Sequence, residues 1–153
     1  MKNKKQGCPA CGSRETRVVT KSRSVVATDG TELTFKDKWS VCKECKQEFY
    51  TREQSLASSR ASADLKRKHE GLLGPSDIKA IRDKYGVTQV ELEKVLGTGP
   101  KTVVRWERGT VSQGKAVDTL LTVLADHPNV FWALAERRGV VRGTTPAAKK
   151  KAS

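Results

Sequence analysis

Two neighbouring stretches decide the fold of the C-terminal half: Thr88-Gln-Val-Glu-Leu-Glu-Lys-Val-Leu-Gly97 and, three residues later, Lys101-Thr-Val-Val-Arg-Trp-Glu-Arg-Gly109. Thr88 suits a helix N-cap because its hydroxyl can accept a hydrogen bond from a free backbone N–H, and Glu91 stands at the capping-box position. Each stretch ends in a glycine, which favours the end of a helix there. The pattern predicts two short helices joined by a tight turn, the second running from Pro100 to Arg108.

The second predicted helix has two different faces. On a helical wheel, Val103 and Trp106 share one face, and Lys101, Val104, Arg105 and Arg108 share the opposite one. Arginine can hold guanine O6 and N7 with two hydrogen bonds, and the start of a recognition helix is where side chains meet base edges. A merely solvated charged face is the alternative interpretation. The candidate DNA-binding residues are Thr88, Gln89, Lys101, Thr102, Arg105 and Arg108.

Further helix signals flank these stretches. Ser76 is a plausible cap for a helix beginning at Asp77, and two more helices are expected at about 115–126 and 128–138. Gly71-Leu-Leu-Gly74-Pro75 interrupts the chain and marks a domain boundary. Residues 71–139 are therefore expected to form an all-α five-helix domain that carries the candidate DNA-binding helices.

The four cysteines form two C-x-x-C pairs, Cys8/Cys11 and Cys42/Cys45. Two such pairs can converge to supply the four thiolates of a tetrahedral zinc site, and four protein ligands leave no open position for catalysis. The alternatives are a redox dithiol, disulfides or iron–sulfur ligation. The cofactor expected from this spacing is a structural Zn²⁺ ion.

Between the cysteine pairs the chain favours strands. Leu33, Phe35, Trp39 and Val41 follow the two-residue period of a half-buried strand, interrupted by Asp37. Asp29-Gly30 suits the turn of a hairpin. The fold class is thus α+β: a small zinc-stabilised β-hairpin domain with a linker helix over residues 1–70, the five-helix domain, and a disordered basic tail over 140–153.

Charge narrows the classes of function. The net charge of +13 favours an acidic partner such as nucleic acid, and residues 1–68 carry 16 basic against 8 acidic side chains.

No stretch is long and apolar enough to span a membrane or act as a signal core, so we expect a cytoplasmic protein with no membrane association. No paired carboxylates, phosphate loop or Ser/His/Asp arrangement is present, which argues against an enzyme.

The two helical stretches resemble the Xre or phage-repressor helix-turn-helix family almost position by position. Together with the cysteine pairs and Leu120-Leu-x-Val-Leu-x-x-His127-Pro128, they make residues 7–138 similar to the MqsA-type antitoxin family of bacterial toxin–antitoxin systems. This resemblance implies that the zinc domain contacts a cognate toxin. It also implies that the C-terminal domain forms a homodimer on a palindromic operator in double-stranded DNA, so that the antitoxin represses its own operon.

In the second predicted helix, the sequence departs from the pattern of the family at one position. Arg105 matches a base-reading arginine of the family, whereas Lys101 stands where the family carries a base-reading asparagine. The operator is therefore expected to differ, or to be read differently, at that contact. The aromatic pair Phe131 and Trp132, with Leu134, can be either core or dimer interface.

Two other functions fit the same residues. One is a phage or plasmid transcriptional regulator with a zinc ribbon and no toxin partner. The other is a protein adaptor that binds no DNA.

Overall fold

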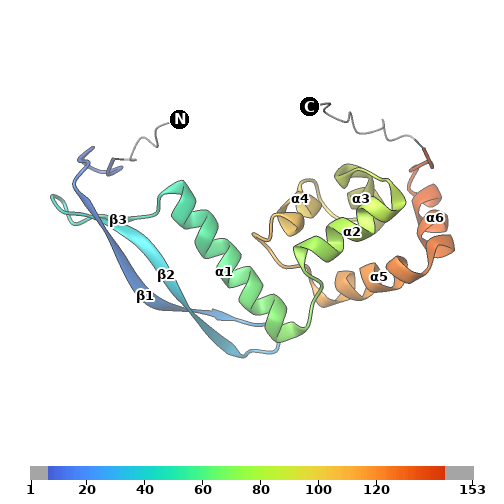
Figure 1. Ribbon diagram of the computed structural model, residues 1–153, viewed down its shortest axis with the longest axis horizontal. Coiled ribbons are helices and arrows are strands. Elements are labelled where there is room, and N and C mark those ends of the chain that lie inside the picture. The colour runs from blue at the N-terminus through green and yellow to red at the C-terminus, as the bar shows by residue number, and fades with distance from the viewer. Residues whose placement is uncertain (1–6, 144–153) are drawn as a thin grey trace, which may run out of the picture. The chain divides into compact units, whose positions relative to one another are not determined.

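The computed structural model describes residues 7–143, and these divide into two compact units that meet at the junction of Glu70 and Gly71 (Figure 1). The fold class is α+β, as predicted: one unit contains an antiparallel sheet and one helix, and the other contains five helices. Among the described residues, no helix combines the length and apolar content needed to cross a bilayer.

The N-terminal unit is organised by a long hairpin. Strands β1 (Thr16–Val26) and β2 (Glu32–Cys42) pair over their whole length, and the short β3 (Glu48–Phe49) joins the far side of β2. The hairpin turn contains the predicted Asp29-Gly30 pair. Gly30 has a φ of 87°, and the Asp29 carboxylate accepts a hydrogen bond of 2.9 Å from the backbone N–H of Thr31. Sequence patterning therefore located this turn correctly.

Helix α1 (Arg52–Glu70) packs against β2 and is part of this unit, not a free linker (Figure 1). Its last turn is fastened to the hairpin turn. The Glu70 carboxylate accepts hydrogen bonds from the backbone N–H and the hydroxyl of Thr28 at 2.8 and 2.7 Å, and His69 lies 2.8 Å from the Asp29 carboxylate.

Asp37 interrupts the apolar face of β2 because it serves an internal ion pair. Its side chain is 2% exposed, and it accepts hydrogen bonds from the Tyr50 hydroxyl at 2.7 Å and from Arg23 at 3.0 Å. Burial raises the pKa of Asp37, but these hydrogen bonds outweigh burial and hold the pKa below its usual value. A charged residue thus occupies a core-facing position without an unpaired charge.

The C-terminal unit consists of α2 (Pro75–Tyr85), α3 (Gln89–Leu96), α4 (Thr102–Glu107), α5 (Lys115–Asp126) and α6 (Pro128–Arg137). All five helices contribute to one apolar core. Its fully buried side chains include Ile78, Leu92, Val103, Leu121, Leu124 and Phe131. Phe131 stacks on Tyr85 with ring centroids 3.7 Å apart, so this member of the C-terminal aromatic pair belongs to the core.

Three boundaries differ from the sequence-based predictions. Helix α2 is capped at Gly74 with Pro75 as its first residue, not at Ser76, and the Asp77 carboxylate accepts the Gly74 N–H at 2.8 Å. Helix α4 begins at Thr102, because Lys101 adopts a left-handed backbone with a φ of 61°. Val140, the first residue of the predicted tail, is buried in the core. Residues 141–143 of the predicted tail are also described, and residues 144–153 lie outside the described residues.

Candidate metal centre and nucleic-acid interface

The four cysteines converge on one point. Cys8 and Cys11 precede β1, Cys42 ends β2 and Cys45 lies in the turn that follows, and their four Sγ atoms all lie within 4.8 Å of one another. The Cys8–Cys45 and Cys11–Cys42 Sγ distances are 3.5 and 3.6 Å. Zinc–sulfur bonds of about 2.3 Å in a tetrahedron would place the sulfurs about 3.8 Å apart. The thiols therefore fit a zinc ion, and they are too far apart for disulfide bonds of about 2.0 Å.

The two cysteine turns have the same backbone design. The N–H of Cys8 donates to the Ser13 carbonyl at 2.8 Å, and the N–H of Cys42 donates to the Gln47 carbonyl at 3.0 Å. In each turn the residue after the second cysteine is left-handed: Gly12 has a φ of 73° and Lys46 a φ of 61°. Gly12 could be predicted from sequence, whereas a lysine gives no such signal.

The thiols influence one another's ionisation. The backbone N–H of Cys45 is the strongest of the contacts that lower the pKa of Cys42 to about 7. The Gln47 N–H lowers the pKa of Cys45, but the neighbouring sulfurs outweigh it and raise that pKa to about 12. Four thiolates cannot form this close together unless a cation compensates their charge, which is what a soft divalent metal provides.

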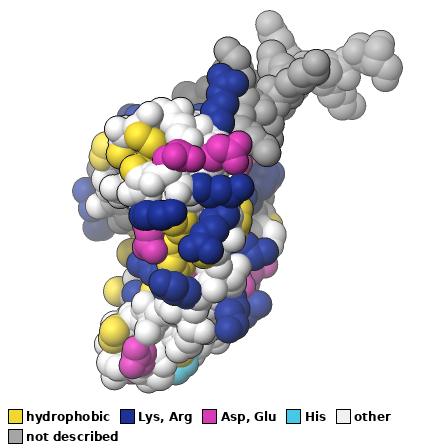
Figure 2. Space-filling view, turned by 90° about the vertical axis from the view of Figure 1, so that its left-hand side faces the viewer, with side chains coloured by type: hydrophobic (Ala, Val, Ile, Leu, Met, Phe, Trp, Pro, Cys, Tyr) yellow, Lys and Arg dark blue, Asp and Glu magenta, His cyan; other side chains and the backbone are white. Residues whose placement is uncertain are grey.

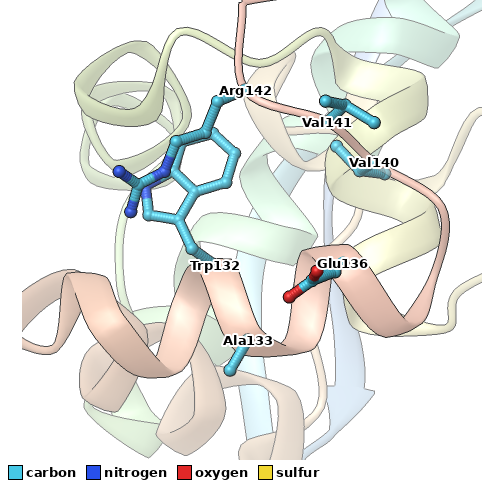
Figure 3. Close-up of a pocket in the computed structure, with 6 residues that line it drawn as sticks. All are labelled: Trp132, Ala133, Glu136, Val140, Val141 and Arg142. Carbon is cyan, nitrogen blue, oxygen red and sulfur yellow. The ribbon is translucent and has the colours of Figure 1, made fainter.

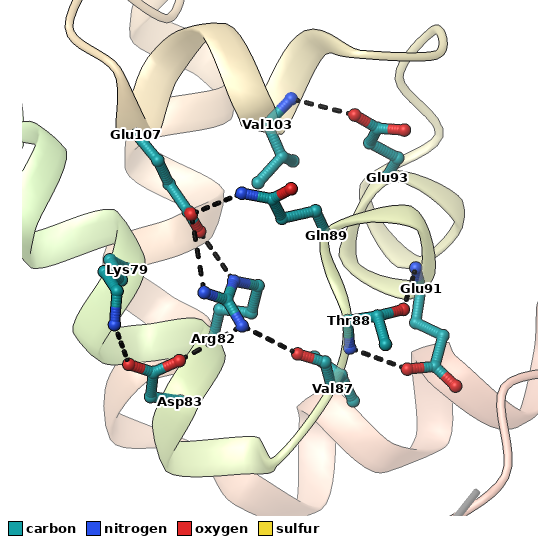
Figure 4. Close-up of polar contacts among 10 residues, drawn as sticks. All are labelled: Lys79, Arg82, Asp83, Val87, Thr88, Gln89, Glu91, Glu93, Val103 and Glu107. Carbon is teal, nitrogen blue, oxygen red and sulfur yellow. Dashed lines mark hydrogen bonds and ion pairs between the residues drawn. The ribbon is translucent and has the colours of Figure 1, made fainter. Parts of the chain in front are cut away.

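Helices α3 and α4 form the candidate nucleic-acid interface, and the capping predicted for α3 is confirmed. The Thr88 hydroxyl accepts the Glu91 N–H at 3.2 Å, and the Glu91 carboxylate accepts the Thr88 N–H at 2.7 Å (Figure 4). Glycine 97, also left-handed, ends the helix. The start of α3 is therefore fixed by local sequence alone.

Buried acidic side chains hold α4 against its neighbours. The Glu107 carboxylate accepts hydrogen bonds from Arg82 on α2 at 2.6 Å and from the Gln89 side chain at 2.7 Å (Figure 4). The Glu107 hydrogen bond raises the pKa of Arg82. Glu93, 5% exposed, accepts the backbone N–H of Val103 at 3.0 Å. Sequence reasoning missed these three charged residues; the placement of Glu107 directly after the core residue Trp106 was the available signal.

The division of α4 into two faces is confirmed for its core residues and its three cations, whereas Val104, also predicted on the outward face, is half-buried. Val103 and Trp106 are buried, whereas Lys101, Arg105 and Arg108 are exposed and Thr102 is half-buried. The Arg105 Nε donates to the Lys101 carbonyl at 3.3 Å, which leaves the two terminal nitrogens of the guanidinium at the outer end of the side chain.

Of the remaining predicted site residues, Thr88 caps α3 and Gln89 contacts Glu107. Each therefore already has a structural role in the isolated chain.

A pocket of about 520 Å³ opens beside α6 in the same unit, lined by Trp132, Ala133, Glu136, Val140, Val141 and Arg142 (Figure 3). Trp132 is half-buried, and the Arg142 guanidinium lies 4.7 Å from its ring centroid. Val141 of the lining is 65% exposed, and Val130, elsewhere on α6, is 42% exposed. Trp132 thus differs from Phe131, because it combines contact with the core and access to the surface.

In the N-terminal unit, β1 has a partner on one side only, within the part of the chain that the structure describes. No residue of this strand is fully buried, and Val18 and Val26 are 63% and 57% exposed. Lys and Arg side chains gather on the face shown in Figure 2, with few acidic ones among them. The strand offers an eleven-residue open edge, and it carries the exposed cations Arg17, Lys21 and Arg23 and no acidic residue.

Comparison with known proteins relates the chain to antitoxins. The model of the family described as the antitoxin component of a bacterial toxin–antitoxin system, MqsA, matches residues 6–135. Antitoxin HigA-2 of Vibrio cholerae is 31% identical over 84 residues, which cover 51% of this chain and 80% of that relative. Both similarities are to antitoxins, which are regulatory proteins and not enzymes.

Proposed function

Because the chain belongs to the MqsA family of antitoxin components, we propose that it neutralises a cognate toxin through its N-terminal unit and represses its own operon through α3 and α4. The main support for the proposed DNA binding is the geometry of α4. Its apolar side chains Val103 and Trp106 are buried, and the cations Lys101, Arg105 and Arg108 face outward. A short helix fixed at both ends with such a face suits the major groove.

The roles of the outward residues follow from their chemistry. The terminal nitrogens of Arg105 suit guanine O6 and N7, and Lys101 suits an acceptor on a neighbouring base or a phosphate. Arg108, Thr102 and the α3 N-terminus around Thr88 and Gln89 suit backbone phosphates. Base contacts would give the sequence preference, and phosphate contacts would fix the register of the helix in the groove.

Two copies are needed for firm binding. Residues 69–139 hold 10 basic and 9 acidic side chains, so one C-terminal unit attracts phosphate only weakly. A homodimer on a palindromic operator doubles the contacts and matches protein symmetry to DNA symmetry. The Trp132 pocket and the exposed Val130 and Val141 support an interface beside α6. Sedimentation of the protein as a monomer at micromolar concentration would argue against the dimer.

A zinc ion held by Cys8, Cys11, Cys42 and Cys45 would give the N-terminal unit its stability. Few apolar side chains are buried there, notably Trp39, Val41 and Ala63, and such small units commonly need a metal to fold. The ion would clamp the base of the β1–β2 hairpin, whose other end is fastened to α1 by Thr28 and Glu70. The hairpin would therefore be held rigidly at both ends.

The open edge of β1 supports a docking site for the toxin. An unpaired strand presents backbone N–H and C=O groups that another strand can bond, and proteins usually shorten, bend or cover such edges. Here the edge is long, and it carries exposed apolar side chains at Val18 and Val26 besides its charges. A partner strand laid along β1 would bury these side chains and satisfy the edge.

Co-expression and a reporter test the two halves separately. The chain should rescue growth of cells expressing its cognate toxin, which we expect to be encoded by a small gene beside its own, and should silence a reporter placed behind its own upstream DNA. Val18→Asp should abolish rescue and leave silencing intact, whereas Val123→Asp, on the 43% exposed Val123 of α5, should change neither. Failure of the wild-type chain in both assays would refute the proposed function.

A further inference from the structure

Val104 is the apolar residue on the outward face of α4. It lies one turn from Lys101 and Arg108 and next to Arg105, all three of which are exposed. Val104 itself is half-buried. In the described residues, the half-buried apolar side chains that pack against the core of the C-terminal unit are Leu73, Leu96, Val117, Leu120, Ala125, Trp132 and Leu134, and Val104 is not one of them. Core packing therefore does not explain this valine.

Helix stability does not explain it either. Valine loses side-chain freedom in a helix because its branched Cβ crowds the preceding turn, so alanine or a long polar residue would suit α4 better. Its neighbour Val103 is fully buried and supports the core. Val104 has no such function, although it occupies an interior position of a six-residue helix.

We propose that Val104 reads a thymine, by placing its methyl groups against the thymine 5-methyl group in the major groove. This inference rests on the proposed binding of α4 to DNA and adds a specificity-determining residue to it. The thymine methyl is the apolar group that a base pair presents in that groove, and the other groups there are hydrogen-bond donors and acceptors. The stiff side chain of valine would hold its methyl groups in place without further loss of freedom.

The position of Val104 beside Arg105 makes the inference more specific. Consecutive residues of a helix project about 100° apart, so Val104 and Arg105 would meet different base pairs of one half-site. We therefore expect each operator half-site to contain a guanine read by Arg105 and, close to it, a thymine read by Val104. Removing the thymine methyl would cost contact with Val104 and leave the hydrogen bonds of Arg105 unchanged.

Base analogues test this pairing directly. Duplexes that the wild-type protein selects from a pool with a randomised centre are remade with deoxyuridine in place of each thymine in turn, and binding is measured by fluorescence anisotropy. At one position per half-site, wild-type affinity should fall about fourfold, the factor that corresponds to about 0.8 kcal/mol per methyl-sized group removed from water. Val104→Ala should lose this sensitivity, because the methyl groups that make the contact are gone.

Two controls separate this idea from its premise. Replacing the guanine read by Arg105 with 7-deazaguanine should weaken binding of Val104→Ala as much as it weakens binding of the wild type. That result would show that the variant folds and still binds in register. Val123→Ala, on α5, should behave as the wild type in every arm. If 7-deazaguanine weakens binding but deoxyuridine affects the wild type and Val104→Ala equally, the thymine contact is overturned and the reading of guanine by Arg105 stands. Selection of no preferred sequence would overturn it together with the proposed reading of DNA.

Discussion

The buried carboxylate of Glu93 on α3 accepts a hydrogen bond of 3.0 Å from the backbone N–H of Val103 in the first turn of α4. This bond links α3 to the first turn of α4 and satisfies an N–H that has no partner within the helix. Glu93→Ala leaves that N–H buried and unpaired, so we expect the free energy of unfolding to fall by about 1–3 kcal/mol. Glu93→Gln keeps an acceptor oxygen and should lose much less. Urea denaturation followed by tryptophan fluorescence measures both, and equal midpoints for all three proteins would refute this role.

The ion pair between Arg82 and Glu107 should be the most sensitive contact of the C-terminal unit. Their side chains are only 15% and 8% exposed. Removal of one partner leaves a largely buried charge, and we expect Arg82→Ala to cost about 3 kcal/mol. The double variant Arg82→Ala, Glu107→Gln removes the unpaired charge and should recover part of that loss. A double variant less stable than Arg82→Ala would show that Glu107 does not depend on Arg82.

The left-handed lysine of the second cysteine turn offers a stabilising substitution. A non-glycine residue in this conformation costs about 1–2 kcal/mol, so Lys46→Gly should raise the stability of the zinc-loaded protein by about 1 kcal/mol. The matched change Gly12→Ala should lower stability. A Cβ at Gly12 would meet no atom within 4 Å, so the cost there is one of backbone conformation alone. Thermal unfolding measures both variants, and a destabilised Lys46→Gly would contradict the expectation.

Metal removal should affect the two units differently. We expect the purified chain to hold zinc, and a chelator to unfold the N-terminal unit while the C-terminal unit stays folded, since the metal supplies folding free energy only where its ligands lie. Amide hydrogen exchange reads each unit separately. Protection should disappear in β1 and β2, persist in α2–α6, and return when zinc is added back. Unchanged protection in β1 and β2 after complete removal of metal would contradict a structural role for the ion.

Sequence signals were sufficient to predict those features whose conformation depends on residues close together in the chain. The two C-x-x-C pairs, the Asp29-Gly30 turn and the Thr88 capping box each depend on residues close together in sequence, and the structure contains all three. The buried face of α4 was predictable for the same reason, since Val103 and Trp106 are three residues apart.

The features that sequence did not reveal depend on distant partners. Asp37 faces the core because Arg23 and Tyr50 satisfy it, and Glu107 is buried because Arg82 lies opposite on another helix. Helix α4 begins at Thr102, two residues later than predicted, because Lys101 in the preceding turn has a left-handed backbone. A lysine in the sequence gives no indication of that conformation. Val140 joins the core through a turn after α6.

The reading of DNA by α4 is tested most directly by the affinity of Arg105→Ala for the selected operator and for operators altered at each guanine. The variant should lose about 1–3 kcal/mol of binding free energy, and its preference at one guanine per half-site should disappear. Arg52→Ala, which removes an exposed arginine of α1 in the other unit, should bind as the wild type. Equal weakening on every sequence would make Arg105 a phosphate contact, and unchanged binding would contradict the assignment of α4 as the DNA-reading helix.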